Sequence, residues 1–463
     1  MPLVLLLKHT GTLTASTVNL STGSGSIGAS GNAINTAAST LSVTSAGNAY
    51  ISNNGSVTLT GSDITVGSGN TLSLATISGN IAVDGSVGSG NSISSIILNA
   101  AGSITETTGT LTASTVNLTS GTGSIGASGT AINTAASNLS INSGADAYVS
   151  NTGSVSLTSA TAGNSNTFSL ATTSGNIAID SNVAAGSGTI GTIALNAAGA
   201  ITETTGTLTA STVNLTSGTG SIGANGNAIN TAASNLSVTS AGNAYISNNG
   251  SVTLTGSNIT IGSGDTLSLA TTSGNIAVDG NVGSGSIGSI ILNAANAITE
   301  TTGTLTANNV NLTSGTGSVG ASGAAVNTAT SNLSVTSAGN AYISNNGSVT
   351  LTGTNITVGS GDILSLATTS GNIAINGNVG SSSSIGSIIL NAAGALTETT
   401  GTLTASTVNL TSGTGSIGAS GVGNAISTAA SNLSINSGAN AYVNNVGSVN
   451  LNSGAAGNGD TLV

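Results

Sequence analysis

The sequence predicts an all-β protein, a parallel β-helix solenoid, and three observations favour this fold. Apolar and polar residues alternate with period two, as in SVTLTG, where Val252 and Leu254 face one way while Ser251, Thr253 and Thr255 face the other. Gly, with 69 residues in total, interrupts these strands every six to ten residues, and Gly and Asn tolerate the positive φ of tight corners. The third observation is an internal repeat, the usual mark of a solenoid.

The repeat has a period of 97 or 98 residues. The string GTLTAS or GTLTAN begins at Gly11, Gly109, Gly206, Gly303 and Gly401. The five tyrosines follow the same spacing, at Tyr50, Tyr148, Tyr245, Tyr342 and Tyr442. We therefore divide the chain into a start at 1–9 and five copies, at 10–108, 109–205, 206–302, 303–400 and, truncated, 401–463.

Each copy divides further into short units that pair two strands across a Gly or Asn corner. From Asn235 these units are 235–249, 250–265, 266–285, 286–303 and 304–331. Five units in about 97 residues predict about five coils per copy, each coil stacked about 4.8 Å above the last. The alternative, a string of sandwich domains, would need a thicker core than one Tyr per copy and no Trp can supply.

Composition excludes several classes of function. The 463 residues include one Lys or Arg, one His, no Cys and twelve acids, for a formal charge of -11. Binding to nucleic acid or to an anionic membrane surface needs the basic residues that are missing. No apolar run approaches the roughly 18 residues of a membrane span. We expect no enzyme, no catalytic residue and no cofactor, because isolated acids have no partner of opposite sign and no Ser has a base to activate it.

The start of the chain, Met1–His9, matches no part of the repeat. It has none of the ordered features of a secretory signal peptide. One set of codons for Met1–Lys8, regrouped by one base, encodes NAAGAITE, which precedes TGTLTAS elsewhere in the chain. We interpret this segment as an out-of-frame or non-native start, which makes Lys8 and His9 accidental rather than functional.

The recurring acids are expected to be structural. Glu106, Glu203, Glu300 and Glu398 occur once per copy, so a five-coil copy would place them roughly 24 Å apart, too far for a carboxylate pair. We interpret them as solvated, outward residues that discourage sideways aggregation. A second set, Asp84, Asp180 and Asp279, aligns with Asn376, so its charge is dispensable.

Three further acids are the candidates for a calcium site. Asp265, Asp362 and Asp460 follow GSG or GNG, which is similar to half of a calcium-binding nonapeptide. Such sites need the motif on successive turns, whereas here it occurs once per copy, with Asn70 and Asn166 in two copies. The pattern favours a Gly-rich corner and no metal site.

Two other patterns of polar residues recur along the chain. Thr-x-Thr pairs such as Thr253–Thr255 are typical of ice-binding solenoids, but those need the pair on every coil, and here only some units have it. The repeated Asn residues are expected to stack into side-chain ladders at the corners.

Nearly all of 10–463 consists of units such as SVTLTGSNITI and TLSLATTSGNIAV and of units similar to SIILNAAGAITETTGTLTA. These units resemble the repeat region of filamentous-haemagglutinin-like bacterial exoproteins. The resemblance implies a right-handed β-helix, export through an outer-membrane transporter, and adhesion at the cell surface or after secretion. We expect a stalk that presents repeated polar surface to host or neighbouring cells or their glycans, as a piece of a larger protein. The alternative is a self-associating matrix or surface-layer protein, and an ice-binding solenoid is a third.

Overall fold

The structure is a computed structural model that describes residues 11–60, 64–90, 92–255, 259–283, 287–352, 356–380, 384–421 and 423–463. The start at 1–9, with our interpretation of its reading frame, lies outside these residues. Within them the chain forms strands, turns and bends and no helix. It divides into two compact units, Met1–Ala233 and Ser234–Val463.

The strands of the first unit are short, and alternate residues along most of them are buried. They are β1 (Leu13–Thr22), β2 (Ile34–Ser45), β3 (Ala49–Asn54), β4 (Val57–Thr60), β5 (Thr65–Val66), β6 (Thr71–Ser78), β7 (Ile81–Asp84), β8 (Ser95–Ala100), β9 (Ile104–Thr108), β10 (Leu111–Ser120), β11 (Ile132–Ser143), β12 (Ala147–Asn151), β13 (Val155–Ala162), β14 (Thr167–Thr172), β15 (Ile177–Ile179), β16 (Val183–Ala185), β17 (Ile190–Ala197), β18 (Ile201–Glu203) and β19 (Leu208–Ser217). The division between the units falls inside β20 (Ile229–Ser240).

The strands of the second unit follow the same pattern. They are β21 (Ala244–Asn249), β22 (Val252–Thr255), β23 (Thr260–Ile261), β24 (Thr266–Ser273), β25 (Ile276–Asp279), β26 (Ser289–Ala294), β27 (Ile298–Thr302), β28 (Leu305–Ser314), β29 (Val326–Ser337), β30 (Ala341–Asn345), β31 (Val349–Thr352), β32 (Ile363–Thr368), β33 (Ile373–Asn376), β34 (Ser387–Ala392), β35 (Leu396–Thr400), β36 (Leu403–Ser412), β37 (Ile426–Ser437), β38 (Val443–Asn445) and β39 (Asn450–Ala455).

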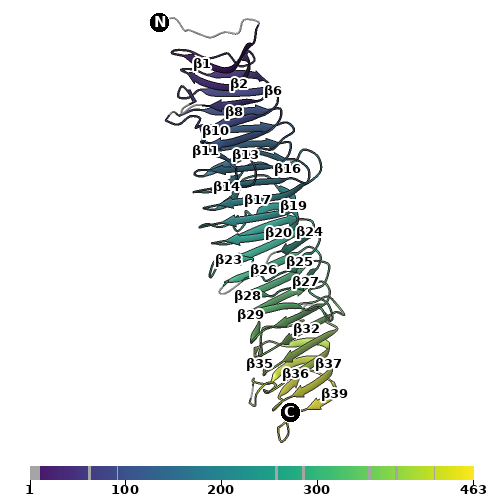
Figure 1. Cartoon of the computed structure of the whole chain (residues 1–463). Helices are drawn as coiled ribbons and strands as arrows, with labels where there is room; N and C mark the ends of the chain where they lie inside the picture. Colours follow the sequence, from purple (N-terminus) through teal and green to yellow (C-terminus); the bar gives the residue numbers. More distant parts are fainter. Residues whose placement is uncertain are drawn as a thin grey trace. The chain divides into compact units, whose positions relative to one another are not determined.

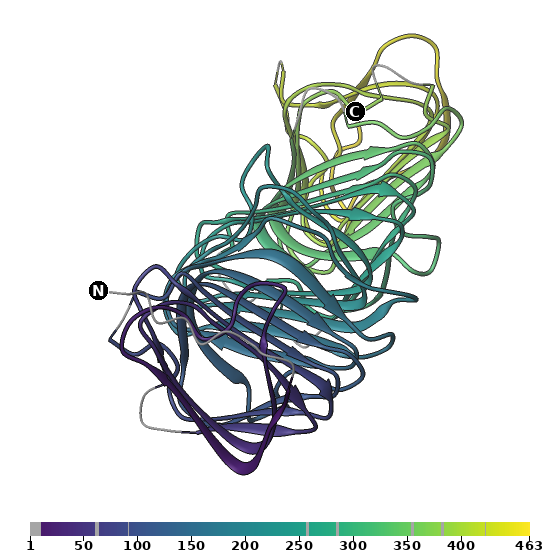
Figure 2. The same ribbon diagram turned by 90° about the horizontal axis from the view of Figure 1, so that it is seen from above.

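Each unit is a parallel β-solenoid, which confirms the predicted fold class. A strand pairs in parallel with the strand one coil earlier and one coil later, as β6 does with β3 and β8 (Figure 1). Figure 2 shows the coils of the first unit, in purple to teal, following one another around a common interior. Parallel stacking follows from the sequence, since a short strand can bury its apolar face only together with strands of the coils that precede and follow it.

The register shows how the repeat advances along the first unit. We followed paired residues from each coil to the next, starting at Val18. They are Leu41, Leu59, Val83, Ile104, Ile125, Ala147, Phe168, Ile193 and Val213. At one step the series shifts within a strand, because Val83 pairs with Glu106 and the series continues from Ile104, two residues earlier. Val18 and Val213 occupy the same place in the first and third copies. Two copies therefore span nine coils, with about 22 residues in an average coil.

The second copy lies half a coil out of phase. The residue of the second copy that is equivalent to Val18 is Val116. It belongs to a second series of paired residues, or column, that runs from Ile27 through Ala49, Leu72 and Ile96 to Val116. We name the column that starts at Val18 column A and the one that starts at Ile27 column B. The second unit repeats this arrangement, because Leu236 and Leu433, in the third and fifth copies, are also nine paired steps apart.

The expectation of five coils per copy is therefore wrong, and the register gives four and a half. The physical reason is that coils differ in length, so counting corners does not count coils. Leu139 pairs with Leu157 after 18 residues, whereas Phe168 pairs with Ile193 after 25. Successive copies consequently exchange columns, and alternate copies return to the same column.

The core consists of small and medium aliphatic side chains, as the composition requires. Phe168 is fully buried and pairs with Ala147, whose small side chain leaves room for the ring. Leu72 occupies the position of Phe168 in the first copy and pairs with Ala49 in the same way. A thin core thus forms without large aromatic clusters.

Buried Asn residues stabilise the corners, but they do not form the expected ladders. Asn53, Asn151, Asn248 and Asn345 are fully buried, one per copy, and so do not stack on each other. The Asn53 carboxamide oxygen accepts hydrogen bonds from the Thr36 hydroxyl at 2.7 Å and from the Ala38 amide at 2.9 Å. Its nitrogen donates to the Ala38 and Gly55 carbonyls at 3.1 and 3.0 Å. The side chain therefore bonds to a corner of its own coil and to the preceding coil, where an identical Asn is not available.

Candidate functional site

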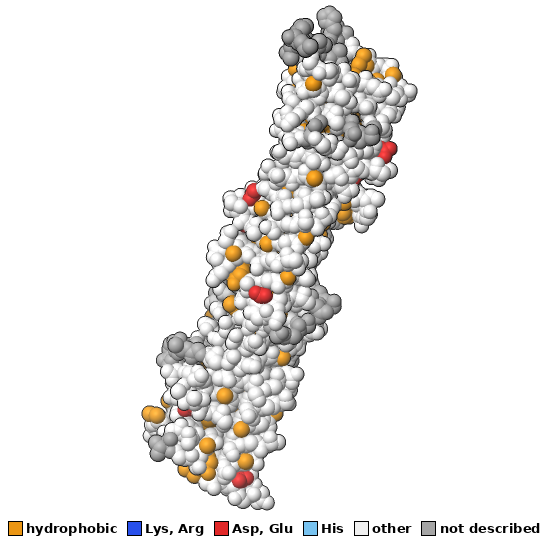
Figure 3. All heavy atoms as spheres, turned by 90° about the vertical axis from the view of Figure 1, so that its left-hand side faces the viewer, with side chains coloured by type: hydrophobic (Ala, Val, Ile, Leu, Met, Phe, Trp, Pro, Cys, Tyr) orange, Lys and Arg blue, Asp and Glu red, His pale blue; other side chains and the backbone are white. Residues whose placement is uncertain are grey.

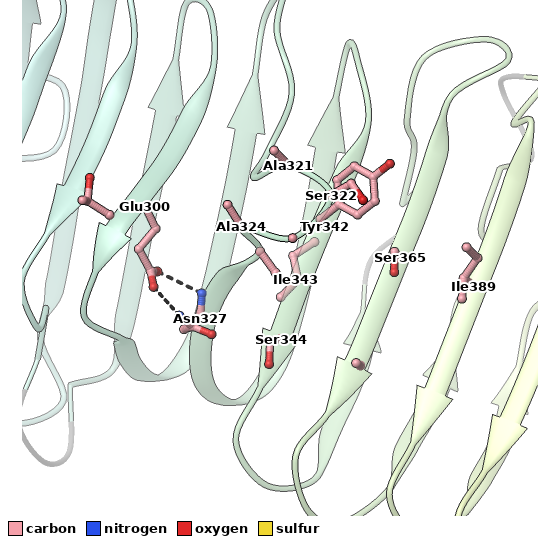
Figure 4. A pocket seen from close by; sticks show the side chains of 14 residues that line it. Glu300, Ala321, Ser322, Ala324, Asn327, Tyr342, Ile343, Ser344, Ser365 and Ile389 are labelled. Atoms are coloured by element: carbon pink, nitrogen blue, oxygen red, sulfur yellow. Dashed lines mark hydrogen bonds between the residues drawn. The ribbon is translucent and has the colours of Figure 1, made fainter.

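A recurring surface cluster combines a Glu, a short hairpin, an Asn and a Tyr from consecutive turns of the chain. We name it the Glu–Tyr groove. In the first unit it contains Glu106 of β9, Asn133 of β11 and Tyr148 of β12. In the second unit the equivalent residues are Glu300, Asn327 and Tyr342 (Figure 4).

The hairpin in the groove follows from local backbone chemistry. The Ala127 and Thr130 amides and carbonyls bond to each other, both at 3.0 Å. Gly126, with φ +68°, begins the excursion, and a Cβ there would lie 2.5 Å from the Tyr148 carbonyl oxygen. Only Gly combines this left-handed conformation with such a close approach. The second unit repeats the hairpin between Ala321 and Ala324, with both bonds at 2.9 Å.

The Glu side chain connects two coils. Glu300 accepts a hydrogen bond from the Asn327 amide at 2.9 Å on one carboxylate oxygen and from the Asn327 side-chain nitrogen at 2.5 Å on the other. Both bonds are drawn in Figure 4. Glu106 makes the same pair of bonds to Asn133, at 2.9 and 2.5 Å. Each carboxylate oxygen still has capacity for another donor.

The other two Glu residues are held in a related way. Glu203, only 5% exposed, accepts from the Asn230 amide at 2.8 Å, and Glu398 accepts from the Ser427 amide at 2.8 Å. The expectation of solvated, outward Glu side chains is therefore wrong. The carboxylates are half-buried or buried because each turns back onto the chain that follows the hairpin.

Burial changes the protonation of these groups. Desolvation raises the pKa of Glu106, Glu203, Glu300 and Glu398 above the ordinary value of 4.5, and hydrogen bonds from Asn133, Asn230, Asn327 and Ser427 partly oppose that shift. Desolvation is the larger effect on the pKa, and among the described residues no cationic neighbour adds to the hydrogen bonds that oppose it. Glu106 and Glu203 belong to columns A and B, half a coil out of phase, and do not form a carboxylate pair.

The groove itself is sizeable and is lined by both polar and small apolar side chains. Its volume is about 720 Å³ at Glu300 and about 610 Å³ at Glu106. The floor of the larger groove is the outward face of three stacked strands, where Tyr342, Ser365 and Ile389 are register partners. Ser and Ala side chains beside the Tyr leave the space open, and the hairpin forms a wall.

The calcium candidates lie at corners of the coils. The Asp265 amide donates to the Gly262 carbonyl at 3.1 Å, and those of Asp362 and Asp460 donate to the Gly359 and Gly457 carbonyls at 3.1 and 2.9 Å. The three residues thus close equivalent turns in different coils. Over the part of the chain that the structure describes, no group of three or more His, Cys, Asp or Glu residues is arranged to hold a metal ion.

The second Asp set and the Thr pairs have simple local roles. The Thr302 hydroxyl donates to Asp279 at 2.9 Å, and the Thr400 hydroxyl donates to Asn376 at the same distance, so either side chain serves as the acceptor. Thr253 pairs with Asn235 and Ala277. The neighbouring coils therefore lack the Thr residues that a flat ice-binding array would need at this place.

Sequence reasoning identified the Glu and Tyr periods separately but not their meeting in one groove. Glu106 and Tyr148 are 42 residues apart, about two coils, and the groove that they share is closed by the hairpin that lies between them in the chain. The recurring GASG or GANG string after each Glu was the available signal for that hairpin.

No protein-family model matches the chain, and no curated protein or solved structure is detectably similar to it. Among the described residues, the structure contains no helix of the length and apolarity needed to cross a membrane.

Proposed function

We propose that this chain is part of the β-solenoid stalk of a bacterial surface or secreted adhesin, right-handed in its coiling and exported through an outer-membrane transporter. The observation that carries the proposal is the recurrence of the Glu–Tyr groove with the repeat. Each compact unit contains one, around Glu106 in the first unit and around Glu300 in the second. Regular presentation of one surface cluster suits multivalent attachment, in which many weak contacts add to a strong one.

The character of the surface also supports an adhesive or structural role. Figure 3 shows a face made mostly of backbone and of side chains that are neither charged nor hydrophobic, with isolated acids and scattered hydrophobic side chains. The described residues include no Lys, Arg or His, and the Glu carboxylates have no second acid or base beside them with which to catalyse a reaction. The resemblance of the repeat units to filamentous-haemagglutinin-like exoproteins points to the same location and role.

Attachment of chain-coated beads tests the proposal. Beads carrying the full chain at several surface densities are applied to cultured epithelial cells and to bacterial cells, and bound beads are counted. We expect attachment that rises more steeply than chain density, because avidity depends on simultaneous contacts. Beads without attachment at any density would contradict adhesion. If such beads instead cluster with one another, and light scattering of the free chain grows with concentration, the self-associating alternative is correct.

A further inference from the structure

The Glu–Tyr groove has the properties of a ligand site that is built twice from the same parts. Glu300 and Glu106 each share the groove with a hairpin wall and with a Tyr two coils further along the chain, and the two grooves have similar volumes of about 720 and 610 Å³. Pockets of roughly 300–1,000 Å³ are the usual size for small-molecule sites.

The groove offers hydroxyl groups that the protein leaves available. Within the described residues, the side-chain hydroxyls of Tyr342, Ser344 and Ser365 have no protein hydrogen-bond partner, and all three residues line the groove. The corresponding hydroxyls of Tyr148 and Ser169 are in the same situation. A ligand that enters must therefore satisfy several hydroxyls, which favours a polar ligand over an apolar one.

The charge of the groove restricts the ligand further. The Glu300 carboxylate accepts hydrogen bonds and cannot donate when ionised, so its partner must carry donors. The formal charge of the chain is -11, and the described residues include no basic side chain to neutralise a phosphate, sulfate or carboxylate. Anionic ligands are thus repelled, while neutral hydroxyl groups suit both the carboxylate and the Ser and Tyr hydroxyls.

The Tyr ring supplies an apolar surface beside these polar groups. In the view of Figure 4, the ring of Tyr342 lies near Ser322, between Ala321 and Ala324 toward Glu300 on one side and Ser365 and Ile389 on the other. Tyr342 is half-buried, so part of the ring is accessible. A sugar ring combines an apolar C–H face with hydroxyls at its edge, and aromatic side chains present matching apolar area.

We propose that the groove at Glu300, Asn327 and Tyr342, and its counterpart at Glu106, Asn133 and Tyr148, binds neutral saccharides. The Tyr ring packs against the C–H face of a sugar, the Glu carboxylate accepts its hydroxyls, and the Ser hydroxyls bind along its edge. The assignment rests on the proposed adhesive function and deepens it, because it names the class of surface group to which the copies attach.

Tyrosine NMR signals test this assignment directly, since the chain has five Tyr and no Trp. Maltotriose and cellotriose are titrated as neutral probes, with trigalacturonate as the anionic one and a chitosan trisaccharide as the cationic one. Substitution of single Tyr residues by Phe assigns the ring signals. We expect at least one neutral trisaccharide to shift the Tyr148 and Tyr342 signals in a saturable way, and trigalacturonate to shift neither.

The two grooves serve as controls for each other within one molecule. Glu300→Gln should weaken binding at Tyr342 about tenfold or more, because a charged acceptor is lost, and should leave the Tyr148 titration unchanged. Asp279→Asn is the matched control for net charge, since its position tolerates Asn in another copy, at Asn376. It should leave both titrations as they are.

Three outcomes would overturn the assignment: no saturable shift with either neutral probe, binding of the cationic probe alone, or equal loss at both tyrosines in Glu300→Gln. The bead experiment is independent of this one. Beads that attach although neither neutral probe binds would remove the saccharide assignment and leave adhesion standing. Neutral probes that bind to a chain whose beads never attach would remove adhesion and leave the saccharide site.

Discussion

Replacement of the buried corner Asn345 is expected to cost far more stability than replacement of its exposed neighbour Asn346. Asn345 is fully buried, whereas the adjacent Asn346 is exposed. The Asn345 oxygen accepts from the Thr328 hydroxyl at 2.8 Å and from the Thr330 amide at 3.0 Å. Its nitrogen donates to the Thr330 and Gly347 carbonyls at 3.3 and 3.1 Å.

The magnitude follows from the groups that would be left unpaired. Asn345→Ala removes the acceptor of a buried hydroxyl and of a buried amide. Each buried polar group without a partner costs about 1–3 kcal/mol, so the free energy of local unfolding should fall by about 2–6 kcal/mol. Asn346→Ala removes one exposed bond, from the Thr369 hydroxyl at 3.1 Å, and should cost less than about 1 kcal/mol.

Hydrogen exchange measured on peptides is the suitable assay, because a solenoid opens locally and a single unfolding midpoint averages over many coils. Amides of β29 and β30 should exchange much faster in Asn345→Ala than in Asn346→Ala, while those of β36 stay protected in both. Equal exchange of β29 and β30 in the two variants would refute the reasoning that the buried Asn stabilises the corner.

Three further predictions concern pH, the hairpin and the core. The four Glu residues have a pKa raised by burial, so their contribution to stability is fully present below about pH 4.5 and is lost as the pH rises through their folded-state pKa. The urea midpoint should therefore be higher at pH 3.5 than at pH 7, and replacing all four by Gln should flatten that trend, whereas a midpoint that increases with pH would contradict it. Gly320→Ala should speed hydrogen exchange in the hairpin more than Gly323→Ala. Both glycines have positive φ, but only at Gly320 would a Cβ collide with a backbone carbonyl oxygen, at 2.6 Å. Equal effects of the two substitutions would mean that this close approach is unimportant. Phe168→Ala should destabilise the coils around β14 by about 3–5 kcal/mol. Phe168→Leu should destabilise them by less than about 1.5 kcal/mol, because Leu fills the equivalent position in other copies. Hydrogen exchange of β14 measures both effects, and a Leu variant as unstable as the Ala variant would contradict the argument.

The groove shows where prediction from sequence reached its limit. The period of Glu300 and Tyr342 was evident, and so was the lack of a partner charge. Interpreting Glu300 as solvated was wrong because its burial depends on Asn327, which is placed by the hairpin and not by sequence spacing. The buried corner Asn residues do not stack for a similar reason, since one buried Asn per copy has only different side chains above and below it. One stacked pair does form at the surface, where the Asn332 side chain donates to its register partner Asn309 at 3.2 Å.

Sequence by itself determined that the protein is a parallel β-solenoid with an aliphatic core, because period-two alternation, Gly corners and close internal repetition leave few other ways to bury the apolar residues. Its composition also determined a surface without basic groups among the described residues. The tertiary structure alone decided that two copies make nine coils, and hence that Glu106 and Glu203 lie in different columns. The physical reason is that coil length depends on how each corner and hairpin folds against the preceding coil, and those contacts join residues that no local pattern brings together.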